Sequence, residues 1–176
     1  MGGSWAVMSA PAALSIFDLA CTNRQTGTFA VLSGWQAAEL DALTALIVPS
    51  DATGPGAREA GVVWFIDAAV SQDPDGPAQQ DQMLSELTTA VRERFGSDSL
   101  AELAPEEQIQ IAHDLEETQF FGQIRNATLN GMFAHPRHGG NRDKAGWKLI
   151  GFDDRHAWQP PFGHYDAEYA NPSSDA

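Results

Sequence analysis

Apolar residues recur at helical spacing in five separate runs. The alternation of apolar and polar residues that predicts a β-strand does not extend over a useful length anywhere in the chain. Ser33 and Gln36 have the form of a capping box that opens the first run, and Pro49 ends it. Pro105 suits the first position of the fourth run, and Thr118 suits the N-cap of the fifth. The first predicted helix follows Ser33 and ends at Pro49, and the second covers about residues 57–70. The third carries an apolar face from Met83 to Phe95, the fourth begins at Pro105, and the fifth follows Thr118. Short turns join them, which favours an all-α, bundle-like domain.

The second predicted helix is expected to be the buried one, because residues 62–66 (Val-Val-Trp-Phe-Ile) are apolar on every side. Gly61 lies inside this helix, where a glycine costs about 1 kcal/mol relative to alanine. Such a glycine usually allows another backbone to approach closely.

The charge balance excludes several classes of partner. The chain carries 10 basic and 24 acidic side chains, for a net charge of -14, and so lacks the clustered Lys and Arg that bind nucleic acid or anionic lipid. Cys21 is the single cysteine, which rules out an internal disulfide and a cysteine-rich zinc site. No apolar stretch reaches the length of a membrane span. At 43% apolar residues, the chain is expected to be a globular protein that buries a core.

The acidic charge is confined to the first two thirds of the chain. Residues 1–120 hold 4 basic and 18 acidic side chains, whereas residues 121–176 hold 6 of each. We therefore divide the chain into an N-terminal arm (1–32), a helical body (33–133) and a long, irregular C-terminal arm (134–176) rich in glycine and aromatic residues. Its aromatic residues and arginines are typical of protein–protein interfaces. The alternative is that this arm folds back on its own helices.

Two other functions are open on the residues alone. His135, His138 and His156, with neighbouring carboxylates, have the chemistry of a metal site, which would make the chain a stand-alone metal-dependent enzyme. Alternatively, the chain would be an acidic scaffold, or a carbohydrate-binding module that uses an exposed tryptophan. Known nucleophile, nucleotide and dinucleotide motifs are missing from the sequence, so no residue is assigned a catalytic or cofactor-binding role.

Two blocks of the sequence resemble a known family. The second reads Gly-Gly-Asn-Arg-Asp at residues 139–143 and Gly-Trp-Lys-Leu-Ile-Gly-Phe at residues 146–152. The first reads Ile-Val-Pro-Ser-Asp at residues 47–51 and Pro-Gly-Ala-Arg-Glu-Ala-Gly-Val at residues 55–62. Their order and spacing, with Phe120 and Phe121 between them, are similar to the gluconate 2-dehydrogenase subunit 3 family over residues 29–165.

The resemblance implies a partner. Members of this family are small, non-catalytic subunits of FAD-dependent sugar, sugar-acid or glycoside dehydrogenases. The FAD and the catalytic base belong to a large subunit of the glucose-methanol-choline type, and electrons often pass on to a cytochrome c subunit. The small subunit is thought to stabilise, mature or export the large one. This implies a periplasmic or membrane-associated location through the complex, while the lack of a twin-arginine pair leaves a cytoplasmic location open.

The arm is expected to wrap this larger partner. Asn141 tolerates a positive φ, Arg142 and Asp143 are expected to pair and fix the turn, and Trp147 and Trp158 are expected to be the anchors. The residues predicted to bind the partner are Asn141, Arg142, Asp143, Trp147, Leu149, Ile150, Phe152, Trp158, Pro160, Phe162 and Tyr165.

Overall fold

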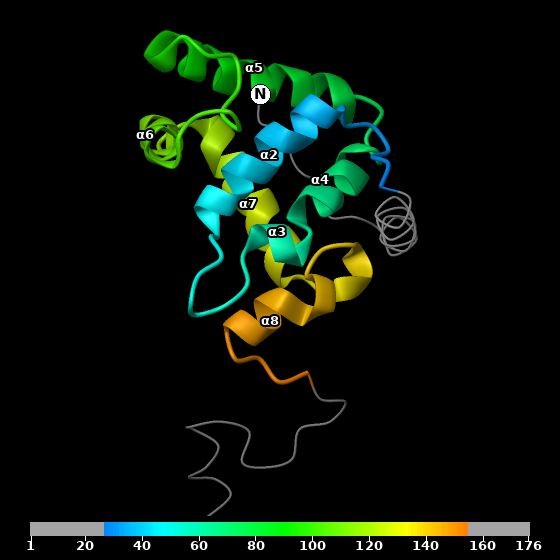
Figure 1. The fold of residues 1–176 in the computed structure, drawn as a ribbon. Coiled ribbons are helices and arrows are strands. Elements are labelled where there is room, and N and C mark those ends of the chain that lie inside the picture. Colours follow the sequence, from blue (N-terminus) through cyan, green and yellow to red (C-terminus); the bar gives the residue numbers. More distant parts are fainter. Residues whose placement is uncertain (1–26, 155–176) are drawn as a thin grey trace, which may run out of the picture.

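The computed structural model describes residues 27–154, which form helices joined by turns, with no strand among them (Figure 1). The helices are α2 (Gly34–Ile47), α3 (Ala57–Ala60), α4 (Val62–Val70), α5 (Gly76–Phe95), α6 (Pro105–Leu115), α7 (Gln119–Phe133) and α8 (Ala145–Leu149). Two 3-10 turns, η1 (Pro136–His138) and η2 (Arg142–Lys144), lie between α7 and α8. The prediction of an all-α fold is confirmed.

Capping residues set the helix starts as the sequence predicts. The Ser33 Oγ accepts a hydrogen bond from the Gln36 amide at 3.2 Å, and the Gln36 Oε1 accepts one from the Ser33 amide at 2.7 Å. At α7, the Thr118 Oγ1 accepts a hydrogen bond from the amide of Phe121 at 3.1 Å. These side chains satisfy amides that have no partner inside the helix, so the capping box and the Thr118 cap are confirmed.

One predicted helix is wrong in its continuity. The helix predicted over residues 57–70 is broken at Gly61, whose φ of 71° ends α3 and redirects the chain into α4. Helix α5 begins at Gly76, with Pro77 in its first turn, and so extends beyond the apolar face that starts at Met83. Residues 77–79 are exposed, so the start of α5 carries none of the apolar spacing that marks a buried helical face.

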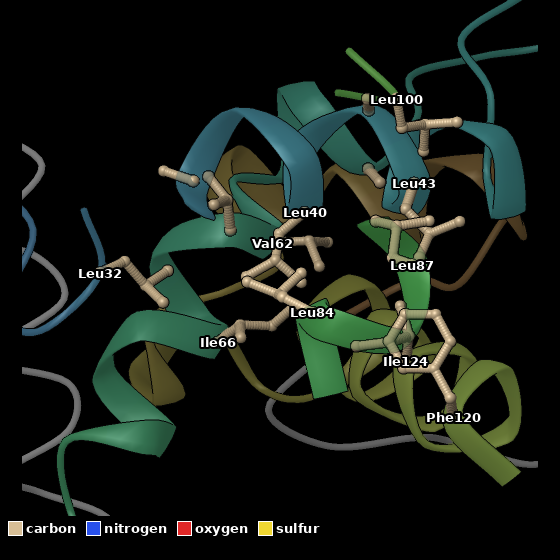
Figure 2. Close-up of a cluster of buried hydrophobic side chains, with 14 of the residues drawn as sticks. Leu32, Leu40, Leu43, Val62, Ile66, Leu84, Leu87, Leu100, Phe120 and Ile124 are labelled. Carbon is tan, nitrogen blue, oxygen red and sulfur yellow. The ribbon is translucent and has the colours of Figure 1, made fainter. Parts of the chain in front are cut away.

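The core lies where α2, α4, α5 and α7 meet (Figure 2). Each helix contributes large apolar side chains that are fully or almost fully buried: Leu40, Leu43, Val62, Ile66, Leu84, Leu87, Phe120 and Ile124. Helices α4 and α7 pack along each other, and the expected burial of residues 62–66 is confirmed for Val62, Val63 and Ile66, whereas Trp64 and Phe65 are half-buried. Helix α7 runs from the end of the molecule that holds α5 and α6 toward α8 at the opposite end (Figure 1).

Two buried carboxylates hold loops against this core. Asp67 of α4 is fully buried and accepts the backbone amides of Ala30, Val31 and Leu32 at 2.7, 3.0 and 3.0 Å. Glu39 of α2, also buried, accepts the Leu100 amide at 2.7 Å and the Ser99 hydroxyl. Convergent amides replace the water that a buried carboxylate loses. Both carboxylates therefore position loops that precede α2 and α6.

Two glycines with open space around them should respond to alanine in opposite directions. Gly96 ends α5 with a φ of 69°, so Gly96→Ala should destabilise the fold by about 1 kcal/mol. Gly122 lies within α7, and Gly122→Ala should stabilise the fold by up to about 1 kcal/mol. Chemical denaturation of both variants measures this, and shifts of the same sign would contradict these helix assignments.

Candidate partner-binding site

The C-terminal end of α7 is closed by residues from the second sequence block. The last carbonyls of a helix lack partners within it. The Asn141 amide donates to the Gly131 carbonyl at 2.6 Å, and the Asn141 Nδ2 donates to the Ala134 carbonyl at 2.9 Å. The Trp147 Nε1 donates to the Phe133 carbonyl at 2.9 Å. We call Gly140, Asn141, Gly146 and Trp147 the α7 clamp.

Asn141 is the centre of the clamp. Its side chain is fully buried, and its Oδ1 accepts the Gly146 amide at 2.9 Å. One side chain thus joins the end of α7 to the start of α8. The backbone of Asn141 has a φ of 45°, a conformation that asparagine tolerates better than most residues. Asn141 was predicted to touch a partner, and the structure gives it hydrogen bonds within this chain.

The clamp requires glycine at two positions. A Cβ at Gly140 would lie 2.1 Å from the Gly131 carbonyl oxygen, and one at Gly146 would lie 2.0 Å from the Met132 carbonyl oxygen. No side chain fits either space. The glycines of the arm predicted irregular structure, but they bring the backbone close enough to α7 for α8 to form at Ala145–Leu149. That prediction is wrong for this segment.

A charged turn projects from the clamp. Arg142, Asp143 and Lys144 are exposed, and φ is 54° at Asp143 and 57° at Lys144. The Arg142 Nε lies 3.4 Å from the Asp143 Oδ2, so the predicted pairing of these two residues is present. The Lys144 Nζ lies 2.8 Å from the Asp154 Oδ2. Such backbone angles persist where the surrounding structure fixes them, and buried Asn141 provides that support.

An apolar surface follows the clamp, and we call it the tip surface: Trp147, Ile150 and Phe152. The half-buried Trp147 ring, held by its hydrogen bond to α7, contacts the Phe152 ring edge-on at 5.1 Å between centroids. Ile150 and Phe152 are 61% and 48% exposed. Leu149, in contrast, is half-buried. The predicted contacts Trp158, Pro160, Phe162 and Tyr165 lie outside the described residues.

The two sequence blocks meet next to this surface. A Cβ at Gly54 would lie 2.9 Å from the Leu149 Cδ1, and α3 contacts both η2 and α8. The Glu59 carboxylate of α3 accepts the Gly56 amide at 3.0 Å and the Ser50 hydroxyl. The hydrogen bond from Ser50 is the largest cause of a lowered pKa at Glu59. The loop between α2 and α3 is thereby fixed as the surface on which α8 rests.

The family model of gluconate 2-dehydrogenase subunit 3 matches residues 35–154, which include both blocks and the clamp. The chain belongs to this family. The resemblance seen in the two sequence blocks is therefore confirmed, and the family name places the protein among subunits of a dehydrogenase complex. No curated protein and no solved structure matches the chain.

In this family member, two of the histidines proposed as metal ligands have other contacts. The His135 Nδ1 accepts the Arg137 amide at 3.2 Å, and its ring lies edge-on to Trp147 with 5.5 Å between centroids. His138 faces Arg137, with 3.2 Å between its Nε2 and the Arg137 Nε. Across residues 27–154, no three His, Cys, Asp or Glu side chains are grouped to hold a metal ion. His156 lies outside this range, and the alternative of a metal-dependent enzyme gains no support.

The same residues make the stability of this subunit depend on pH. Burial lowers the pKa of His138 below 6.5, and the nearby Arg137 and His135 lower it further. At a pH between the lowered pKa of His138 in the folded chain and its ordinary pKa of 6.5 in the unfolded chain, the unfolded chain binds more protons than the folded one. Stability should therefore rise with pH up to about 6.5, and His138→Gln should reduce that slope. Denaturation midpoints at several pH values measure this, with His113→Gln as the matched surface control; a slope unchanged by His138→Gln would contradict it.

Among the helices of residues 27–154, none combines the length and the apolar character needed to cross a membrane.

Proposed function

We propose that this chain is a non-catalytic small subunit that binds the FAD-containing catalytic subunit of a sugar, sugar-acid or glycoside dehydrogenase. In this proposal it stabilises the catalytic subunit or assists its maturation. The partner is of the glucose-methanol-choline type and holds both the FAD and the catalytic base. The tip surface, which belongs to the C-terminal arm of residues 134–176, supplies the interface.

The observation that carries the proposal is the exposure of Ile150 and Phe152 on a fixed support. These side chains are 61% and 48% exposed, within the block that the family model matches. The Trp147 indole is hydrogen-bonded to α7, and the Phe152 ring contacts it. Apolar side chains held in one orientation lose little entropy on association, which favours their use as interface anchors.

The charge around the tip surface also suits a protein partner. Residues 134–154 hold four basic and three acidic side chains, whereas residues 27–133 hold four basic and 17 acidic. An acidic partner would be repelled by the acidic residues 27–133. The near-neutral segment that carries the tip surface can approach such a partner without this repulsion. In this proposal, the exposed side chains of Arg142 and Lys148 meet carboxylates of the catalytic subunit.

The proposal assigns the electron-transfer chemistry to other chains. The catalytic subunit oxidises the sugar alcohol through its FAD, and electrons pass on to a cytochrome c subunit or another acceptor. The whole complex is periplasmic or membrane-associated. The family name supports the placement in a dehydrogenase complex, and the choice of partner is our inference.

Co-expression tests this function. The FAD subunit is produced with and without this chain, and three quantities are recorded: soluble yield, the visible flavin spectrum, and dye reduction with glucose or gluconate. We expect a yellow complex, with a soluble and active catalytic subunit only when this chain is present. An equal yield of active flavoprotein in its absence would contradict the proposal.

A further inference from the structure

A groove of about 310 Å³ lies between the first turn of α2 and the middle of α5. Trp35 forms one wall with 44% of its surface exposed, and Leu84 lies beneath it. The polar residues that line the groove are Asp81, Ser85, Thr88, Thr89 and Arg92. In Figure 1, α5 lies at the end of the molecule opposite α8, so this groove is separate from the tip surface.

The hydroxyl groups of the groove are oriented as acceptors. The Ser85 Oγ donates its proton to the Gln82 carbonyl at 2.6 Å. Thr88 Oγ1 and Thr89 Oγ1 donate theirs to carbonyls of α5 at 3.0 and 2.8 Å. Because each hydroxyl proton is donated to a backbone carbonyl of α5, each hydroxyl oxygen can still accept a hydrogen bond from a ligand.

Charged groups at the groove add a fixed acceptor and a donor. The Asp81 Oδ1 accepts the Gln36 Nε2 at 2.5 Å, which fixes the carboxylate beside Trp35. The Arg92 Nε is engaged by the Asp98 carboxylate at 2.6 Å, so the remaining guanidinium N–H groups are the donors available to a ligand. Because Asp81 lines the groove and Asp98 offsets the charge of Arg92, an anionic ligand is disfavoured.

We propose that this groove binds a neutral pyranose sugar. A pyranose ring has a face of C–H groups that fits flat against an indole, and it has hydroxyls around its edge. Those hydroxyls donate to Asp81 and to the hydroxyl oxygens of α5, and one accepts from Arg92. Small-molecule sites usually combine an aromatic wall with a few polar groups that point toward the ligand, and this groove has both. This function goes beyond the proposed subunit role, because it lies away from the tip surface and needs no partner.

Calorimetric titration of the full chain tests the site. The ligands are D-glucose, D-gluconate and D-sorbitol, each added up to about 50 mM, because an open groove of this size predicts millimolar affinity. We expect glucose to bind and the anionic gluconate and the acyclic sorbitol to bind at least about tenfold more weakly. Trp35→Ala should weaken glucose binding by about tenfold or more, and Trp35→Phe should retain part of it. Ile109→Ala, at an exposed apolar residue of α6, is the matched control and should bind as the unmodified chain does.

Circular dichroism of each variant establishes that the helices are intact. If Trp35→Ala lowers the helical content, Asp81→Asn takes its place, and it should weaken glucose binding several-fold. Absence of glucose binding by the unmodified chain would overturn the proposal. Unchanged affinity in the folded Trp35→Ala or Asp81→Asn variant would also overturn it, as would equal binding of sorbitol. None of these results depends on the catalytic subunit, so they leave the test of the subunit role independent.

Discussion

Asn141→Ala should lower the free energy of unfolding by about 4 kcal/mol. The substitution leaves the Ala134 carbonyl and the buried Gly146 amide without the partners that Asn141 supplies. Each such loss costs about 1–3 kcal/mol, and alanine at a φ of 45° adds about 1 kcal/mol. For a chain of this size, the thermal midpoint should fall by roughly 8–16 °C.

Two further variants separate the causes. Asn141→Gly keeps the backbone conformation but removes the side chain, so its loss of stability should be about 1 kcal/mol smaller than that of alanine. Asn126→Ala, at an exposed position of α7, is the matched control and should leave the midpoint close to that of the unmodified protein. A midpoint unchanged in Asn141→Ala would show that α8 does not depend on the clamp.

Asp67→Asn should destabilise the fold by about 3 kcal/mol, although the two side chains have nearly the same shape. Three backbone amides converge on the Asp67 carboxylate, one of them on Oδ2 and two on Oδ1. An asparagine side chain has one acceptor oxygen, and its NH₂ group would face at least one backbone N–H group, which is also a donor. Because Asp67 is fully buried, water cannot replace the lost bonds.

The loss at Asp67 should be local as well as global. Residues 29–32 should separate from α4, and the stacked pair Phe29–Trp64, with 4.1 Å between ring centroids, should come apart. Proteolysis near residue 30 and the tryptophan fluorescence of the chain, to which Trp64 contributes, measure this together with the thermal midpoint. Asp75→Asn, at the exposed N-cap of α5, is the control and should behave as the unmodified chain does. Stability equal to that control would show that Asp67 does not hold this segment.

Most of the helices are predictable from the sequence because their signals are local. The caps at Ser33, Thr118 and Gly96 involve hydrogen bonds or backbone angles within a few residues of each cap. The spacing of apolar residues likewise indicates the buried face of a single helix. The break at Gly61 is less visible, because an isolated glycine is compatible with both a continuous and a broken helix. The apolar spacing of α5 starts only at Met83, because most residues of its first turns face solvent.

The site was only partly predictable, and the reason is the range of its contacts. The second block marked residues 139–152 as important, and the charged turn and Trp147 lie there. Asn141 and Trp147 close the end of α7 through hydrogen bonds to residues 131–134. The spacing of apolar residues in the sequence does not predict such hydrogen bonds. Asp67 and Glu39 were missed for the same reason, because a sequence does not show that an acidic residue faces buried amides.

The most direct test of the subunit role is co-purification with the FAD subunit through a tag on this chain. Three forms are compared: the unmodified chain, the double variant Ile150→Asp/Phe152→Asp, and the control Ile109→Asp. Both Ile150 and Phe152 are exposed in the free chain, so the double variant should keep its fold, which circular dichroism checks. The unmodified chain and the control should each recover the yellow flavoprotein, and the double variant should recover at least about tenfold less, because charges would be buried at the interface. Equal recovery by all three forms would contradict the tip surface as the partner interface, and recovery by none would contradict the subunit role itself.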